Sequence, residues 1–304
     1  MIDVIGLGCA CLDFIAMVPY IPDLDNEVRM LESTQQGGGE VATALVALAR
    51  LGASTTYLGR VGDDAPGHMI KRELEAYGVG TEYLGMEQEC ESLVSMVLVD
   101  KDSGKRTIVA GNSTVSELRP SDIPEGLIES ARFLHLDGTS REAALGAAKR
   151  ARRAGVTTVL DADVLVCDPE IEQLIAVTDI LIASVGFSTE FTGTDDPSKA
   201  IAFMAEIGPN VVAITMGDRG SLCLANGRKF HTPAFSVPVV DTTGAGDVFH
   251  GAFIFGLLRG WTIERTAEFA SAVAALKCAH LGGRQGIPTF EETEAFIKTK
   301  HTDG

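Results

Sequence analysis

The chain has 304 residues, 45% hydrophobic and 22% charged, enough for one large α/β domain or two small domains. Its 25 basic and 42 acidic residues give a formal net charge of −17, which repels nucleic-acid phosphates. No apolar run approaches the ~20 residues of a membrane span, and the first residues lack the basic stretch of a signal peptide. We therefore expect neither a nucleic-acid partner nor a membrane partner.

The six cysteines form no C-x-x-C pair and show no repeated spacing. This pattern gives little support to a zinc site or a disulfide framework. We expect reduced thiols and a cytoplasmic location.

Predicted elements alternate along the chain. In the first half we expect a strand at 3–8, a helix at 40–51, a strand at 55–58, a helix at 67–77 and a hairpin at 93–109. In the second half we expect strands at 133–136, 156–160, 179–183 and 211–215, helices at 141–154, 170–177 and 197–207, a hairpin-like stretch at 221–231, and helices at 246–258 and 263–278. Short apolar strands between helices predict a mostly parallel sheet covered on both faces.

Two extended stretches, 12–35 and 90–112, fit this alternation poorly. We interpret them as a small β-sheet lid inserted into a single domain that spans residues 1–304.

Familiar nucleotide-binding motifs are missing. The sequence has no P-loop, and Gly6-Leu7-Gly8 starts a dinucleotide fingerprint in which Cys11 replaces the third glycine. The following residues read as a strand, so a nicotinamide site is disfavoured.

The strongest chemical signal is Asp241-Thr242-Thr243-Gly244-Ala245-Gly246-Asp247, which directly precedes a helix. Small residues at a helix N-terminus expose backbone N–H groups that bind anions. Asp247 in the first turn would then accept a proton from a hydroxyl that attacks a phosphoryl group. The alternative is a helix cap after a tight turn.

Two further glycine-rich segments lie where ligands bind in α/β folds. Gly37-Gly38-Gly39 precedes a helix, and Thr215-Met216-Gly217-Asp218-Arg219-Gly220 follows a strand. Each is equally compatible with a simple turn.

These motifs together resemble the ribokinase-like (PfkB) carbohydrate kinases almost end to end. The first signature runs from Gly38-Gly39 to Leu51-Gly52 and continues with Gly59-Arg60-Val61-Gly62-Asp63-Asp64 and Gly67; the second is 241–247 with Phe249 and Gly251. The segments 274–278 and 282–288 resemble most the branch with ketohexokinase-like and sulfofructose-kinase-like members.

The resemblance implies a three-layer α/β/α core with a small β lid and transfer of the γ-phosphoryl group of ATP to a sugar hydroxyl. It implies that Asp247 is the base and that the backbone of Gly244, Ala245 and Gly246 is the anion hole. The other implied contacts are Asp13, Gly38 and Gly39 for the sugar, Thr215, Gly217, Gly220 and Thr243 for the nucleotide, and carbonyls near Thr243 and Gly282 with Asp241 for a monovalent cation such as K⁺. Mg²⁺ would arrive with ATP, largely bound by water.

The sequence departs from the family pattern at two places. Thr43 stands where many members have a sugar-binding Asn, and a hydroxyl has fewer donors than an amide. The N-x-x-E motif falls on Ser184 and Phe187, which leaves Glu190 as the substitute that would organise the metal-bound waters.

For the acceptor we expect a neutral ketose or pentose. The lid offers Arg29, Lys101, Lys105 and Arg106, but Glu27 and Thr139 occupy positions where a sulfosugar site would carry cations. Among the lid cations we take Arg106 as a sugar contact. A kinase for nucleosides or for acid sugars of the 2-keto-3-deoxygluconate or sulfofructose type, and a non-catalytic sugar-binding protein, remain alternatives.

Other candidates receive modest roles. His135 and His250 are expected as core or helix-surface histidines, and Asp161 and Asp163 either touch the nucleotide or cap a turn. Lid strands in this family often pair between subunits, so we expect a homodimer.

Overall fold

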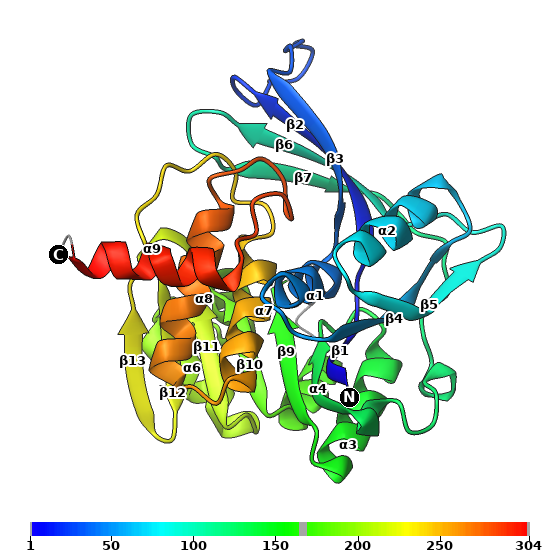
Figure 1. The fold of residues 1–304 in the computed structure, drawn as a ribbon, viewed down its shortest axis with the longest axis vertical. Coiled ribbons are helices and arrows are strands. Elements are labelled where there is room, and N and C mark those ends of the chain that lie inside the picture. Colours follow the sequence, from blue (N-terminus) through cyan, green and yellow to red (C-terminus); the bar gives the residue numbers. More distant parts are fainter. Residues whose placement is uncertain (1, 164–168, 303–304) are drawn as a thin grey trace.

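The computed structural model describes residues 2–163 and 169–302, and two separate sheets dominate it (Figure 1). The large sheet has nine strands in the order β13 (Arg228–Thr232), β12 (Ser221–Ala225), β11 (Val211–Thr215), β10 (Ile180–Ser184), β9 (Thr157–Ala162), β8 (Ala131–Leu136), β1 (Ile2–Leu7), β4 (Thr55–Gly62) and β5 (Gly80–Glu87). Neighbours from β11 to β5 are parallel, and β12 and β13 add an antiparallel hairpin at one edge.

Helices cover both faces of this sheet. One face carries α1 (Glu40–Arg50), α2 (Ala65–Ala76), α7 (Ala245–Leu258), α8 (Ile263–Lys277) and α9 (Phe290–Thr302). The other carries α3 (Arg141–Ala154), α4 (Pro169–Ala176), α5 (Val185–Thr192) and α6 (Pro197–Ile207). Three short 3₁₀ turns complete the described elements, at Pro120–Asp122, Ile128–Ser130 and Gly217–Arg219. The expected three-layer α/β/α fold is confirmed.

Burial of both sheet faces explains the apolar strands. On β1, Val4 packs into one hydrophobic core, whereas Ile5 and Leu7 pack into the other. Helix α7 lies between α1 and α8, and its residues 248–256 are all buried. A helix buried all round has no polar stripe, which accounts for the apolar sequence after residue 247.

The small sheet has the order β3 (Glu32–Gly38), β2 (Cys11–Val18), β6 (Val94–Asp100) and β7 (Arg106–Ala110), and Figure 1 shows it apart from the large sheet. Its strands come from the two stretches that the sequence assigned to a lid. One face packs on a small core that includes Ile15, Val97 and Val99, whereas Met96 and Val109 are exposed.

Three elements were not predicted from the sequence: β5, α5 and α9. β5 is an edge strand that carries acidic residues, and its burial alternates irregularly, so its pattern is weak. α5 has only eight residues, and its start depends on the Ser184 side chain, which accepts a hydrogen bond from the Phe187 N–H. In the described part of the chain, no helix has the length and apolarity needed to cross a bilayer.

Candidate active site

The glycine-rich turn ahead of α7 has a backbone that other residues would distort. Gly244 is the N-cap of α7 and has a φ of 73°, in the left-handed region. A β-carbon there would lie 2.8 Å from the Gly283 Cα, which is backbone and cannot easily move aside. At Gly246 a β-carbon would meet the Asp163 carboxylate at 3.7 Å, an ordinary contact. Gly244 is therefore required by the fold, whereas Gly246 is not.

The predicted anion site depends on the backbone donors at the start of α7. The Ala245 N–H donates to the Thr242 carbonyl at 3.2 Å, so it is already partly engaged. For the N–H groups of Gly246 and Asp247 we find no backbone acceptor among the described residues. Free donors and the positive end of the helix dipole favour an anion at this place.

Asp247 is partly buried in the first turn of α7. Burial raises its pKa to about 7, the Asp163 carboxylate adds to this rise, and the Arg106 guanidinium opposes it. A carboxylate that exchanges a proton near neutral pH is matched to the work of a general base.

Asp13 and two glycines meet at the junction of the two sheets. Asp13 on β2 is only 8% exposed, and burial raises the pKa of its carboxyl group. A β-carbon on Gly38 would lie 2.1 Å from the Asp13 carboxylate, and Gly39 has a φ of 90°. The structure thus brings the three predicted sugar contacts together.

Thr43 has a partner that the sequence did not reveal, the fully buried Arg284. The Arg284 Nε donates to the Thr43 hydroxyl at 3.3 Å, and its Nη2 donates to the Gly38 carbonyl at 2.9 Å. Its Nη1 lies 3.5 Å from the Glu73 carboxylate. The Thr43 hydroxyl is therefore already engaged as an acceptor for a guanidinium that also bonds to Gly38, one of the predicted sugar contacts.

Two more acids, the half-buried Glu40 and the buried Asp137, were missed. Burial, Asp137 and Asp247 raise the pKa of Glu40 to about 8. Asp137 follows β8 and accepts hydrogen bonds from the Cys9 N–H at 2.5 Å and from Thr139 at 2.7 and 2.9 Å. Asp137 follows the end of a parallel strand, a position where α/β sheets bind ligands, and this was the available signal.

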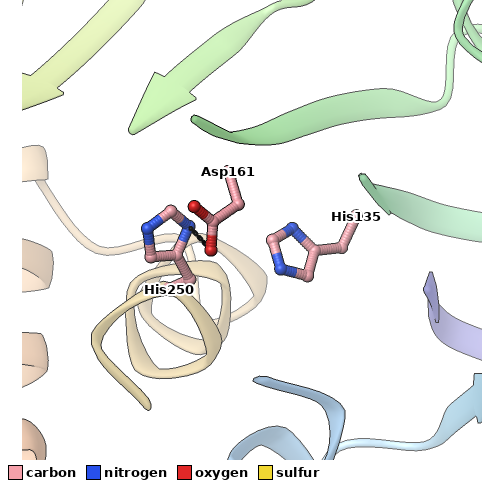
Figure 2. A group of neighbouring side chains, drawn as sticks. All are labelled: His135, Asp161 and His250. Carbon is pink, nitrogen blue, oxygen red and sulfur yellow. Dashed lines mark ion pairs between the residues drawn. The ribbon is translucent and has the colours of Figure 1, made fainter. Parts of the chain in front are cut away.

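His250 lies about one helical turn after Asp247 on α7. Its side chain and those of His135 on β8 and Asp161 on β9 are buried and face one another (Figure 2). The His250 Nδ1 lies 3.5 Å from the Asp161 Oδ2. Burial lowers the pKa of His135 to about 4, lowers that of His250 well below its usual value, and raises the pKa of Asp161. Both histidines are thus uncharged core residues near pH 7. The Asp163 N–H donates to Asp161 at 3.1 Å, so Asp161 also caps its turn.

The predicted nucleotide contacts lie at the end of β11 and in the turn after it. Thr215 ends the strand, and its hydroxyl donates to the Ala183 carbonyl at 3.4 Å. Gly217 and Gly220 have φ values of 63° and 83°, and a β-carbon on Gly220 would lie 2.0 Å from the Thr232 carbonyl. Glu190 is exposed on α5, and no interaction among the described residues links it to Asp247.

Arg106 joins the lid to the glycine-rich turn ahead of α7. Its Nη1 donates to the Thr242 hydroxyl at 3.3 Å. The Gly104 carbonyl, in the lid turn, accepts hydrogen bonds from the Thr242 N–H and hydroxyl, both at 3.1 Å. Arg29, Lys101 and Lys105 are exposed.

Behind the turn lie Asp241, Thr243 and Lys277. The buried Asp241 carboxylate accepts from the Thr243 N–H and hydroxyl at 2.8 and 2.7 Å, and from the Gly282 N–H at 2.7 Å. The Lys277 Nζ donates to the carbonyls of Asp241 and Thr243. The sequence predicted a monovalent cation on carbonyls near Thr243 and Gly282, with Asp241, and the structure shows a lysine on the carbonyls of Asp241 and Thr243.

An α/β/α core with a β lid, and a carboxylate with a raised pKa at an anion-binding helix N-terminus, define a phosphotransferase for small alcohols. The comparison with known proteins agrees, since residues 1–290 match the pfkB family of carbohydrate kinases. The chain belongs to that family.

Similar proteins cover its whole length. An ATP-dependent ribose-1-phosphate kinase of Halopiger xanaduensis is 30% identical over 99% of both chains. A 5-dehydro-2-deoxygluconokinase of Shouchella clausii is 29% identical over 98% of this chain and 96% of its own. The crystal structure of a putative ribokinase from Agrobacterium tumefaciens matches with a TM-score of 0.90 and 28% identity, over 99% of this chain and 98% of that one.

Proposed function

We propose that the protein transfers the γ-phosphoryl group of ATP to a hydroxyl of a small sugar. One observation carries this proposal: Asp247 has a pKa of about 7 and lies in the first turn of α7, where the helix N-terminus favours an anion. In this proposal Asp247 accepts the proton of the attacking hydroxyl, and the N–H groups from Gly244 to Gly246 stabilise the charge on the transferred group. The lid, bonded to Thr242 through Gly104, closes over the sugar and excludes water.

ATP is proposed to contact Thr215, Gly217, Gly220 and Thr243, as the family resemblance implies. Gly217 and Gly220 fit this role because they let the backbone turn sharply at the end of a parallel strand. Mg²⁺ prefers oxygen ligands and retains several waters. The exposed carboxylate of Asp163, near Gly246, fits such a hydrated ion, and Glu190 remains the ligand predicted from the sequence.

A neutral ketose or pentose is the proposed acceptor. Asp13, Glu40, Asp137 and Asp247 place four carboxyl groups around the junction of α1, β2 and α7, and carboxyl groups hydrogen-bond well to sugar hydroxyls. Those of the four that are ionised disfavour an anionic sugar.

An anionic sugar is the second candidate, because Arg106 lies close enough to Asp247 to oppose the rise in its pKa. The names of the two relatives above also point to such substrates, a sugar phosphate and a gluconate derivative.

The test is ADP release with Mg-ATP over ketoses, pentoses, nucleosides, acid sugars and sugar phosphates, run with wild type and Arg106→Gln. Fastest turnover of a neutral sugar, in wild type and in Arg106→Gln alike, supports the first candidate. Fastest turnover of an anionic sugar, with a KM that rises strongly in Arg106→Gln, supports the second. Sugar-induced thermal stabilisation without ADP release would instead indicate a non-catalytic binding protein.

A homodimer formed through the small sheet, and a cytoplasmic location, remain part of the proposal. The outer face of the sheet exposes Met96, Ile108 and Val109, which a second copy would cover. Sedimentation of Val109→Lys tests the dimer, and a mass unchanged from that of a dimeric wild type contradicts it.

A further inference from the structure

Lys277, the last residue of α8, has no exposed surface although it carries an ammonium group. Its Nζ donates to the Asp241 carbonyl at 2.9 Å and also to the Thr243 carbonyl. A lysine is rarely buried unless it is paired. These hydrogen bonds therefore offset a large part of the free-energy cost of removing its ammonium group from water. The lysine is thus bonded to the two residues that lead into the catalytic turn.

The same segment carries a negative charge near this lysine: burial lowers the pKa of Lys277, and the Asp241 carboxylate opposes that fall. The Asp241 carboxylate is fully buried and accepts hydrogen bonds from the Thr243 backbone and hydroxyl, and from the Gly282 N–H. Residues 241–243 are therefore held by two buried side chains: the Lys277 ammonium group bonds to their carbonyls, and the Asp241 carboxylate bonds to the Thr243 N–H. Every polar atom of the carboxylate has a partner, as a buried charge requires.

The effect on the anion site follows from peptide geometry. A trans peptide is planar, so its C=O and N–H point in opposite directions. The Asp241 carbonyl points to Lys277, and the N–H of the same peptide, on Thr242, points away to the lid at Gly104. By the same rule, the bond from Lys277 to the Thr243 carbonyl turns the Gly244 N–H away from the lysine.

A monovalent cation would orient the same peptides, because K⁺ binds backbone carbonyl oxygens in place of water. The family resemblance predicts such an ion on carbonyls near Thr243 and Gly282, with Asp241. Here the carbonyls of Asp241 and Thr243 already accept bonds from an ammonium group of equal charge, so these residues do not fit an added K⁺.

We propose that Lys277 is a built-in replacement for the monovalent cation, a positioning residue that orients the Gly244 N–H and makes the enzyme independent of K⁺. This inference rests on the proposed kinase function. It concerns only how the catalytic turn is held.

The test compares K⁺ with tetramethylammonium at a constant ionic strength of about 0.15 M, in wild type, Lys277→Met and the control Lys149→Met. Methionine has nearly the length of lysine without its charge, and Lys149 is exposed on α3. Both the sugar-kinase rate and the thermal unfolding midpoint are measured. We expect wild type and Lys149→Met to give the same values in both salts.

For Lys277→Met we expect a rate about 100-fold below wild type in tetramethylammonium, the size of effect that a misplaced catalytic group produces. Potassium should restore part of this rate and should raise the unfolding midpoint, since the ion now has room on the carbonyls. A lysine that only stabilises the fold would show no such selective rescue.

Two results overturn the inference: strong stimulation of the wild type by K⁺, or a folded Lys277→Met that K⁺ neither activates nor stabilises. If Lys277→Met does not fold, the salt dependence of the wild type decides. If no sugar is phosphorylated at all, the proposed function fails, and the unfolding midpoints still report whether K⁺ replaces the lysine.

Discussion

The titration of Asp247 links the structure to a measurable rate. Its pKa of about 7 means that about one-tenth of the molecules carry the ionised base at pH 6 and about nine-tenths at pH 8. Because only the ionised form accepts the hydroxyl proton, kcat/KM should rise about tenfold between these pH values. An aspartate with an ordinary pKa of about 3.9 would give a flat profile here.

Two neighbours of Asp247 allow the assignment of this pKa to be tested, because their substitution should shift the pKa in opposite directions. Asp163 raises the pKa of Asp247, so Asp163→Asn should move the inflection of the profile to lower pH. Arg106 lowers this pKa, so Arg106→Gln should move the inflection to higher pH. Initial rates over pH 5.5–9, at saturating Mg-ATP and limiting sugar, give kcat/KM for each variant.

Asp247→Asn is the reference for the profile. Loss of a general base costs about 10²- to 10⁴-fold, and the residual rate should not follow the Asp247 titration. A flat wild-type profile, or inflections that move in the same direction in both neighbour variants, would refute the reasoning.

Three further predictions concern the turn, the buried arginine and Glu40. Gly244→Ala should lower both stability and kcat, because its φ of 73° strains an L-residue by about 1–2 kcal/mol and the added carbon meets backbone. The control Gly246→Ala should unfold in urea like wild type. Equal losses of stability in the two variants would contradict this account. Arg284→Met should cost about 2–4 kcal/mol in urea unfolding, since Thr43 and a buried carbonyl lose their donor; a loss below about 0.5 kcal/mol would show that the guanidinium is not stabilising. Glu40 has a pKa raised from 4.5 to about 8, so the native state binds its proton more tightly and wild type loses stability as pH rises between these values. Glu40→Gln has no such titration. The melting temperature of this variant minus that of wild type should therefore increase from pH 5 to pH 8. A difference that stays constant would show that Glu40 does not titrate in this range.

Local patterns in the sequence predicted the elements that carry the chemistry. The start of α7 was predicted within one residue, because a turn of small residues precedes a long apolar helix. Both strands of the lid hairpin were found from their turn at 102–104, and the sheet core from its short apolar strands. β5 was missed because an edge strand needs no continuous apolar run.

Partners that lie far apart in the chain could not be predicted in this way. Arg284 contacts Thr43 across 241 residues, and Lys277 contacts Asp241 across 36. Both cations stood in motifs quoted for other reasons, and a charged residue in sequence is expected on the surface. Only the fold shows that these two are buried and that they bond to Thr43 and Gly38 and to Asp241 and Thr243.

The most direct test of the central claim is ³¹P NMR of the reaction products with Mg-ATP and the best sugar from the acceptor panel. Wild type should convert the γ-phosphorus signal into a sugar phosphate ester together with stoichiometric ADP. Asp247→Asn, folded and still stabilised by sugar and by ATP, should form this ester at least about 10²-fold more slowly. An ester signal that grows at a near-native rate in Asp247→Asn would contradict the account, and so would inorganic phosphate as the only product of wild type.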